Sequence, residues 1–272
     1  MSLLPKVLIT GANGYVGSHL VKMLRPKYLV YTLDKTGKAD CVADIGGALR
    51  IEQTFDHVVH LAARVSVPES VKYPSLYYST NLMGTLSILQ RVKAHNFVLA
   101  STVGALSMGN PYAVSKRAAE DVVAEARAGK AWTVFRFSNI IGRDARVDNT
   151  LPVSKDGIMA SLVAARRDGV FNLYGGDYDT IDGSAVRDYI HVNEACAAIE
   201  KALREPARGV ETIGSGEGVS VKQLIREYQE ASGVYFRYDT LPRRAGDVAT
   251  NIVTSSSRYY TPAYTLREKV TF

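Results

Sequence analysis

Short apolar runs alternate with segments of helical period through the first half of the chain. The runs at residues 7–10, 30–33, 41–43, 58–62 and 97–99 have the length expected of buried strands. Between them, apolar residues recur three and four positions apart, notably over residues 76–94, where Leu82, Leu86 and Leu89 would form the inner face of a helix. This alternation predicts a parallel sheet with helical crossovers, in which ligands bind outside the carboxyl ends of the strands.

The first apolar run leads into a glycine-rich turn. Gly11, Gly14 and Gly17 separate it from a segment that repeats apolar residues at the spacing of one helix face. Glycine lets the backbone bend tightly and approach a ligand, and the following helix offers N–H groups and a partial positive charge to a pyrophosphate. We therefore expect the turn to hold a dinucleotide.

An acidic residue, Asp34, ends the second apolar run. A carboxylate at this strand end accepts hydrogen bonds from the hydroxyls of the adenosine ribose and repels a 2′-phosphate. Asp34 therefore favours NAD over NADP, although Lys35 and Lys38 follow closely. Residues at further strand ends would line the adenine and pyrophosphate path, with ordinary strand ends as the alternative; these residues are Asp44, Ala62 and Ala63.

A tyrosine and a lysine four residues apart carry the predicted chemistry. Tyr112 and Lys116 begin a segment of helical period, so both side chains should project from one helix face. A lysine ammonium there would lower the pKa of the tyrosine and let it act as a base toward a sugar hydroxyl. Thr102, at the preceding strand end, could bond to the same hydroxyl. Tyr31 and Lys35 share the spacing but lie along a strand, where the two groups would be about 13 Å apart.

The regular alternation loosens after residue 142. We expect a NAD-binding domain over residues 1–142, with later chain crossings, and a mainly substrate-binding lobe over residues 143–272. Polar side chains in the second part suit a nucleotide: arginines for a pyrophosphate, an amide for the same group and a carboxylate for a ribose hydroxyl. These are Arg187, Arg244, Asn139 and Asp247. Two further helices are predicted at residues 193–204 and 220–232, where Ser220 caps the second helix and Gly233 ends it.

Composition and charge add little to the predicted function. The chain has 272 residues, 46% of them hydrophobic, and a net charge of +6 that is spread along the sequence rather than gathered in runs. This charge does not indicate a nucleic-acid partner. The two cysteines and five histidines match no metal-ligand spacing, so no metal is expected. There is no signal-like leader and no apolar run of about 20 residues, so we expect a cytoplasmic protein outside the membrane.

The motifs together resemble a known family. TGANGYVG, Asp34, Asp44, HLAA, the Ser101–Thr102 pair and the Tyr112–Lys116 spacing are similar to those of the extended short-chain dehydrogenase/reductases. The stretches LYGGDYDTIDGSAVRDYIHV (residues 173–192) and PRRAGD (residues 242–247) resemble the UDP-galactose (UDP-glucose) 4-epimerases. The resemblance implies a Rossmann fold of the α/β class, with a doubly wound parallel sheet and a smaller C-terminal substrate-binding lobe. It also implies a homodimer that packs through the helices beginning near Leu76 and Tyr112.

The resemblance carries site residues over to this sequence. The catalytic residues would be Tyr112, Lys116 and Thr102. NAD would contact residues in the glycine turn, at the predicted strand ends and on the helices that follow the first, fourth and fifth strands, namely Gly11, Asn13, Gly14, Tyr15, Val16, Gly17, Asp34, Asp44, Ile45, Leu61, Ala62, Ala63, Asn81, Ser101, Tyr112 and Lys116. A UDP-sugar would contact Thr102, Asn139, Tyr174, Arg187, Arg244 and Asp247, with Tyr174 stacking on the uracil.

The implied activity is NAD-dependent epimerisation of a nucleoside diphosphate sugar. The reaction would occur at C4 of a UDP-hexose or UDP-N-acetylhexosamine and pass through a 4-keto sugar. In related dehydratases an acidic residue follows the strand-end threonine, whereas here Val103 follows Thr102. A keto-sugar nucleotide reductase that uses NAD or NADP is one alternative. A non-catalytic dinucleotide-sensing protein on the same fold is another.

The sequence departs from the 4-epimerase pattern around the sugar. Only nine residues separate Thr102 from Tyr112, where the family has a much longer loop. Ser154 and Lys155 stand where an asparagine and an apolar residue meet the uracil in the family. The short loop motivates the hypothesis that the sugar site is open and accepts a larger, N-acetylated or polymer-linked substrate.

Overall fold

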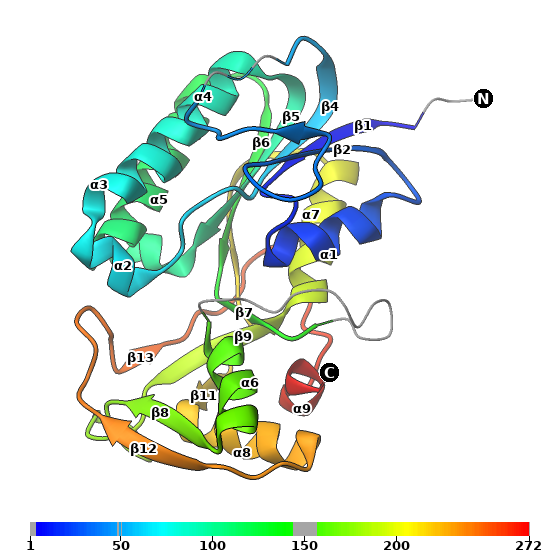
Figure 1. The fold of residues 1–272 in the computed structure, drawn as a ribbon. Helices are drawn as coiled ribbons and strands as arrows, with labels where there is room; N and C mark the ends of the chain where they lie inside the picture. The colour runs from blue at the N-terminus through cyan, green and yellow to red at the C-terminus, as the bar shows by residue number, and fades with distance from the viewer. Residues whose placement is uncertain (1–3, 48, 50, 144–156, 272) are drawn as a thin grey trace. The chain divides into compact units, whose positions relative to one another are not determined.

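The computed structural model describes residues 4–47, 49, 51–143 and 157–271; Ser154 and Lys155 lie outside the described residues. The chain forms two units (Figure 1). Unit 1 consists of Met1–Phe137 and Cys196–Glu211, and unit 2 of Ser138–Ala195 and Thr212–Phe272. The proposed split into an NAD-binding part and a substrate-binding part at residue 142 stays a prediction.

Unit 1 is built on a seven-stranded sheet with the order β10-β6-β5-β4-β1-β2-β3. The pairs from β6 to β3 are all parallel. The strand order reverses at β1, which lies between β4 and β2, and this is the place where doubly wound sheets bind their ligands. The predicted doubly wound parallel sheet is therefore confirmed. Its strands are β1 Lys6–Thr10, β2 Leu29–Asp34, β3 Cys41–Val42, β4 Thr54–His60, β5 Lys93–Thr102, β6 Ala131–Phe137 and β10 Arg208–Ile213.

Helices cover both faces of this sheet (Figure 1). One side carries α2 Val67–Lys72, α3 Pro74–Tyr77, the π-helical η1 Tyr78–Met83, α4 Gly84–Arg91 and α5 Pro111–Ala126. The other side carries α1 Tyr15–Leu24 and α7 Val192–Arg204. A short 3-10 helix, η2 Val103–Leu106, follows β5. In the described part of the chain, none of the helices has both the length and the apolar character needed to cross a membrane.

The helix predicted over residues 76–94 is shorter and rotated in the structure. It ends at Arg91 because Val92 is extended and β5 begins pairing with β4 at Lys93. Its buried positions are Asn81, Gly84, Thr85 and Ile88, whereas the predicted inner face, Leu82, Leu86 and Leu89, is only partly buried. The π-helical turn explains the rotation, because it adds a residue to the turn and displaces the face that follows.

Unit 2 has two small sheets. In the first, β9 Val186–His191 lies between β11 Gly218–Ser220 and β13 Thr250–Asn251, and its last three residues also pair with β7 Asn139–Ile141. In the second, β8 Val170–Tyr174 pairs in parallel with β12 Arg237–Leu241. The helices are α6 Ile158–Asp168, α8 Val221–Ser232 and α9 Leu266–Val270. Ser220 caps α8 by accepting the N–H of Gln223 at 3.0 Å, and α8 ends at Gly233 in the left-handed region.

A buried carboxylate joins three loops of unit 2. Asp188, on β9, is fully buried. Its Oδ1 accepts the N–H and hydroxyl of Ser215, at 2.8 and 2.7 Å, and the hydroxyl of Ser138 at 3.5 Å. Its Oδ2 accepts the N–H groups of Gly216 and Val253, at 3.0 and 3.4 Å. Because every partner donates, the site requires an acceptor at both oxygens.

We predict that Asp188→Asn destabilises the protein by more than about 2 kcal/mol, because the amide group must turn a donor toward one set of N–H or O–H groups. The urea midpoint of unfolding measures the change. Asp239→Asn is the matched control, since Asp239 lies exposed on β12 and its ion pair with Arg237 spans 3.6 Å; it should cost less than about 0.5 kcal/mol. Equal midpoints for the two variants would show that the Asp188 charge is not needed.

Candidate active site

The glycine turn brings the start of α1 against the end of β1. Gly11 has a φ of +70°, and a Cβ there would lie 2.7 Å from the backbone nitrogen of Ala62. A Cβ on Gly17 would lie 2.1 Å from the carbonyl oxygen of Gly11. The N-cap of α1 is Gly14, which has no side chain to cap the helix, and no acidic residue stands in the first turn. The first N–H groups of α1 are therefore suited to an anion such as a pyrophosphate.

Asp34 lies at the rim of this turn. Its Oδ2 accepts the N–H of Asn13 at 3.0 Å, and its Oδ1 accepts the N–H of Thr36 at 3.2 Å. The amide of Asn13 also donates to the carbonyl oxygen of Thr36. These bonds fix the carboxylate while it stays partly exposed, and a carboxylate has further lone pairs for ribose hydroxyls. The glycine turn, the uncapped helix and the acid together fit NAD.

The other predicted cofactor residues of the sheet follow the carboxyl ends of neighbouring strands. The N–H of Ala62, after β4, donates to Thr10 Oγ1 at 3.2 Å. Asp44, after β3, is exposed and accepts the N–H of Gly46 at 2.9 Å, while Ile45 is buried against Gly84. The remaining ones are partly buried in the turn, in α1 and after β4, namely Tyr15, Val16, Leu61 and Ala63.

Asn81 uses its amide within the protein. The side chain is buried, and its oxygen accepts the N–H of Arg64 at 2.8 Å. Its nitrogen donates to the carbonyl oxygen of Arg64 and to Ser115 Oγ, both at 3.0 Å. Asn81 therefore ties the loop after β4 to α5, and its contact with the cofactor stays a prediction.

The start of α5 places the predicted catalytic pair. Asn110 caps the helix by accepting the N–H of Ala113 at 2.9 Å, and Pro111 occupies the first helical position. Tyr112 and Lys116 consequently stand on successive turns of one face. Tyr112 is partly buried, with its ring edge-on to Tyr77 at a centroid distance of 6.3 Å, and Lys116 is buried.

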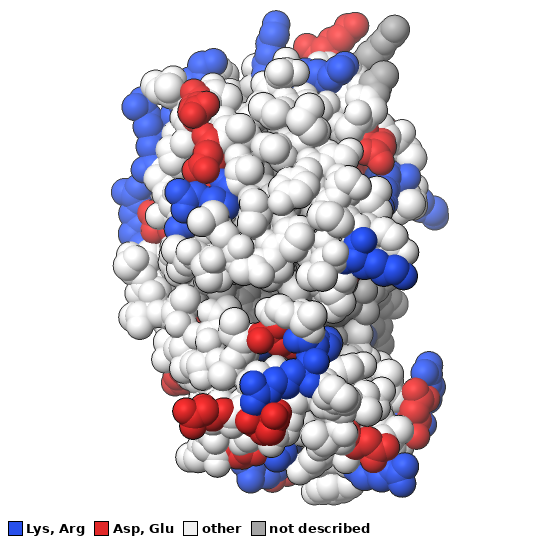
Figure 2. All heavy atoms as spheres, turned by 90° about the vertical axis from the view of Figure 1, so that its left-hand side faces the viewer, with Lys and Arg blue, Asp and Glu red and all other residues white. Residues whose placement is uncertain are grey.

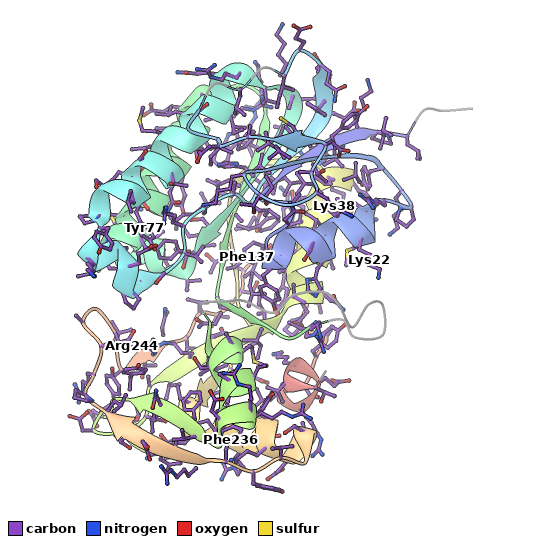
Figure 3. The ribbon with its side chains drawn as sticks, in the orientation of Figure 1. Lys22, Lys38, Tyr77, Phe137, Phe236 and Arg244 are labelled. Atoms are coloured by element: carbon purple, nitrogen blue, oxygen red, sulfur yellow. The ribbon has the colours of Figure 1, made fainter. Side chains whose placement is uncertain are left out.

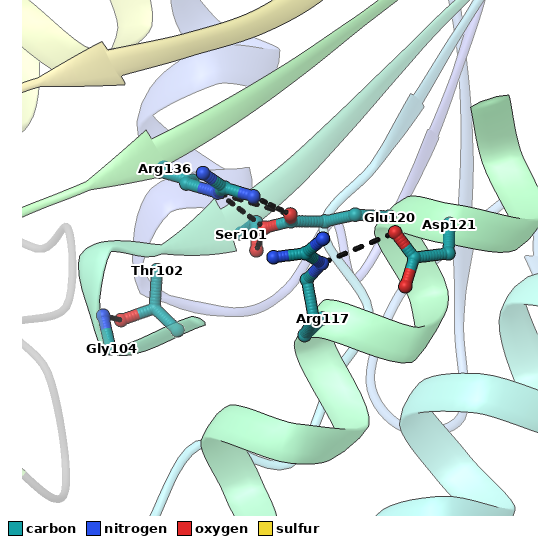
Figure 4. A network of polar contacts seen from close by, with 7 residues as sticks. All are labelled: Ser101, Thr102, Gly104, Arg117, Glu120, Asp121 and Arg136. Carbon is teal, nitrogen blue, oxygen red and sulfur yellow. Dashed lines mark hydrogen bonds and ion pairs between the residues drawn. The ribbon is translucent and has the colours of Figure 1, made fainter. Parts of the chain in front are cut away.

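Thr102 connects the end of β5 to this helix. Its Oγ1 accepts the N–H of Gly104 at 3.1 Å, which orients the hydroxyl, and its side chain hydrogen-bonds to Tyr112 (Figure 4 shows Thr102 and Gly104). The structure therefore brings together the three predicted catalytic residues, Thr102, Tyr112 and Lys116. Their catalytic roles stay predictions.

The electrostatics of the pair differ from the sequence-based expectation. Burial raises the pKa of Tyr112 to about 12, and the hydrogen bond from Thr102 opposes this only in part. Burial also lowers the pKa of Lys116 to about 8, partly offset by the charge of Glu120. The expected lowering of the tyrosine pKa by Lys116 is thus wrong for this structure, because the cost of burying the phenolate exceeds the stabilisation that it receives.

A buried ionic network lies beside the pair. Ser101, at the end of β5, donates its hydroxyl to Glu120 of α5 rather than leaving it open (Figure 4). Arg136 of β6 binds both oxygens of Glu120 through its Nε, at 3.1 and 3.0 Å. Neither Glu120 nor Arg136 is among the predicted site residues. The signal that could have found Glu120 is its position four residues after Lys116, on the same helix face.

Three of the predicted substrate residues gather in unit 2. The guanidinium of Arg244, on the loop after β12, lies 4.3 Å from the ring centroid of Tyr174 at the end of β8 (Figure 3 shows Arg244). Arg244 also forms an ion pair of 3.3 Å with Asp247. The cluster therefore combines a cation, an aromatic ring and a carboxylate, the groups that a nucleotide requires.

Besides Thr102, the remaining predicted substrate residues are Asn139 and Arg187, which lie on paired strands. Asn139 of β7 donates its amide to the carbonyl oxygen of Asp188 at 3.0 Å, and Arg187 of β9 donates to the carbonyl oxygens of Val186 and Ala249, at 2.9 and 3.4 Å. Each side chain is thus partly engaged by backbone. Among the described residues, no group of three or more His, Cys, Asp or Glu side chains could hold a metal ion.

We predict that Lys116→Met is more stable than the wild type at pH 7. The folded pKa of Lys116, about 8, lies below its ordinary 10.5, so the buried ammonium costs the wild type on the order of 3 kcal/mol at pH 7. Between these two values the unfolded chain holds a proton that the folded chain lacks, so the stability of the wild type rises with pH relative to the variant. Urea unfolding at pH 7, 9 and 10.5 measures the gap, and a gap that does not change with pH would contradict the prediction.

Known proteins are similar to this chain in sequence and in structure. Residues 7–214 match the model of the NAD dependent epimerase/dehydratase family. The UDP-glucose 4-epimerase of Bos taurus is 31% identical, over 97% of this chain and 90% of its own length. The UDP-arabinose 4-epimerase 1 of Arabidopsis thaliana is 30% identical, over 89% of this chain and 71% of its own length.

A solved structure is similar over nearly the whole chain. The UDP-glucose-4-epimerase from Stenotrophomonas maltophila, with bound NAD and formylated UDP-arabinopyranose, has a TM-score of 0.84 and 26% identity, and the match covers 98% of this chain and 96% of that one. The likeness to the epimerases and NAD as the cofactor of the family are thereby confirmed. With a family match over most of its length and relatives at this identity, the chain belongs to the NAD dependent epimerase/dehydratase family.

Proposed function

We propose that the protein interconverts the C4 epimers of a UDP-hexose or UDP-N-acetylhexosamine with the help of NAD. The observation that carries the proposal is the arrangement of Tyr112, Lys116 and Thr102 on α5 and at the end of β5, in a sheet whose glycine turn and Asp34 fit NAD. The printed activities of the relatives, UDP-glucose 4-epimerase and UDP-arabinose 4-epimerase, support it.

The three predicted catalytic residues, Tyr112, Lys116 and Thr102, each have a proposed part in the reaction. Bound NAD would supply the hydride acceptor for the sugar carbon and, as NADH, the hydride donor for the return step. Tyr112 takes the proton of the sugar hydroxyl at its phenolic oxygen and gives it back in the reverse step. Lys116 supplies a positive charge that offsets part of the cost of burying the phenolate, and Thr102, held by the N–H of Gly104, orients the hydroxyl.

The UDP group is proposed to bind in unit 2. Arg244 and Arg187 suit the pyrophosphate because a guanidinium offers several fixed donors. Asp247 suits a ribose hydroxyl and Asn139 the pyrophosphate. Arg244 covers one face of the Tyr174 ring, so the uracil would stack on the other face. In this scheme the nucleotide supplies most of the binding energy, and the sugar stays free to turn.

The short segment between Thr102 and Tyr112 supports a broad sugar preference. It consists of η2, residues 107–110 and Pro111 at the start of α5, with Leu106 and Met108 exposed. A segment this short covers less of its surroundings than the longer family loop, so we propose that N-acetylated sugars are accepted.

We further propose that the protein is a cytoplasmic homodimer that pairs through α3, α4 and α5. On this side of unit 1, Leu76 and Met83 are exposed, and Leu82, Leu86 and Leu89 are only partly buried. Figure 2 looks onto this side and shows a broad uncharged area in its upper part, with charged side chains toward the margins. Exposed apolar side chains such as Leu76 and Met83, on a side with a broad uncharged area, are typical of interfaces.

We predict that the protein converts at least one of UDP-galactose, UDP-GlcNAc and UDP-xylose into a mixture of 4-epimers, followed by the anomeric signals in proton NMR. Tyr112→Phe should lower kcat about 10³-fold, because the phenolic oxygen that takes the proton is removed. Tyr31→Phe is the matched control. Tyr31 has the same spacing to a lysine but lies on β2 against Phe55, so the variant should keep full activity. No conversion of any sugar, even with added NAD, would overturn the proposal in favour of a reductase or a sensor.

We predict that Met83→Lys combined with Leu76→Glu yields a monomer, because charges then replace apolar side chains on the proposed interface. Sedimentation velocity at micromolar concentration measures the state. Ile181→Lys is the control, since Ile181 is 98% exposed and belongs to unit 2, which contains none of these helices. A wild-type monomer at that concentration would refute the homodimer.

A further inference from the structure

Glu120 is a carboxylate that the fold has taken out of water. It lies on α5, four residues after Lys116 and eight after Tyr112, and its side chain is only 2% exposed. It accepts the hydroxyl of Ser101 from β5 and both Nε–H contacts of Arg136 from β6 (Figure 4). A buried carboxylate is costly unless it is paired, and here two strands supply the partners.

The charges around Glu120 do not simply cancel. Arg136, 13% exposed, is a partly buried cation and Lys116 is a buried one, and Glu120 is the anion that interacts with each of them. An arginine keeps its proton at every physiological pH, whereas a buried lysine readily loses it. If Glu120 carried no charge, Lys116 would be the cation that becomes neutral.

We propose that Glu120 is a positioning residue whose negative charge keeps Lys116 in its ammonium form beside Tyr112. The hydroxyl of Ser101 donates to the carboxylate of Glu120 and holds it in place. Ser101 therefore has a role beside Glu120 in addition to its predicted contact with the cofactor. The inference rests on the proposed function only for the role of Lys116 in the reaction. The protonation state of Lys116 can be measured whether or not the protein has the proposed function.

Titratable and charged groups reach this site from several elements. On α5 itself they are Tyr112, Lys116 and, toward solvent, the ion pair of Arg117 and Asp121 at 3.2 Å. From the sheet, β6 contributes Arg136, and β4 contributes His60, whose pKa burial and the charge of Lys116 lower to about 3. From α2 and α3, Tyr77 faces Tyr112 and donates to Glu69 at 2.7 Å. His60 is therefore neutral, and Glu120 is the negative group that acts on Lys116.

The test follows the titration of Lys116 directly. Lysine labelled with carbon-13 at Cε is incorporated, and the signal of Lys116 is assigned by its loss in Lys116→Arg. We expect Glu120→Gln, which keeps the shape and removes the charge, to move the midpoint of Lys116 down by about 1 pH unit or more. The alkaline limb of the kcat profile for the UDP-sugar that is turned over should move down with it.

The control changes the same charge at the next position. Asp121→Asn removes one negative charge from α5, but the Asp121 side chain is 59% exposed and water screens it, so the midpoint and the pH profile should stay in place. Arg136→Gln is expected to shift the midpoint up, because Glu120 then acts on Lys116 alone. Since an unpaired buried charge can prevent folding, the double variant Glu120→Gln/Arg136→Gln is prepared as well, and its midpoint should lie above that of Glu120→Gln.

The outcomes separate the inference from the proposed function. A midpoint unchanged in Glu120→Gln, or lowered equally in Asp121→Asn, overturns the role of Glu120 even if the protein epimerises UDP-sugars. A lowered midpoint supports it even if no UDP-sugar is turned over, in which case the proposed function alone fails. A loss of kcat in Glu120→Gln without a shift of the pH profile would indicate a purely structural residue and would also overturn the inference.

Discussion

The burial of ionisable side chains along one face of α5 is the constraint on which the proposed chemistry depends. Tyr112, Lys116 and Glu120 follow one another at four-residue spacing, and β5 and β6 supply the groups that make their burial tolerable. Desolvation works against both charges that the reaction needs, since it raises the pKa of Tyr112 and lowers that of Lys116. The surrounding hydrogen bonds and the ionic network offset part of the free-energy cost of burying these two charges. The reactive state is therefore a balance, and residues outside the reacting pair help to set it.

Much of the fold could be predicted from periodicity and turn chemistry. The strand that leads into Gly11, Gly14 and Gly17, and the capped helix after Asn110, are local patterns that the structure keeps. The helix over residues 76–94 could not be predicted correctly, because the π-helical turn at Tyr78–Met83 depends on packing and leaves no mark in the apolar spacing. The inner face was consequently assigned to leucines that are only partly buried.

In the candidate site, too, some positions follow from local sequence patterns and others depend on the tertiary fold. Local spacing places Tyr112 and Lys116 on one face, and Asp34 at a strand end, so sequence alone predicts these positions. The partners of Glu120 come from β5 and β6, and the link from Asn81 to Ser115 spans 34 positions in the chain. Such contacts arise from sheet order and have no periodic signature. The pKa of Tyr112 could not be foreseen either, because it depends on how far water is excluded.

The chain path through the two units has a consequence for how the protein is made. Residues 196–211, which complete α7 and contribute β10 to the edge of the seven-stranded sheet, are synthesised only after the first part of unit 2. Asp188 of unit 2 in turn waits for Val253, which emerges later still. Unit 1 cannot reach its final form before about half of unit 2 has been synthesised, and unit 2 is completed only after all of unit 1. Folding during translation should therefore stall in partly built sheets, and these intermediates are the stage at which chaperones are most needed.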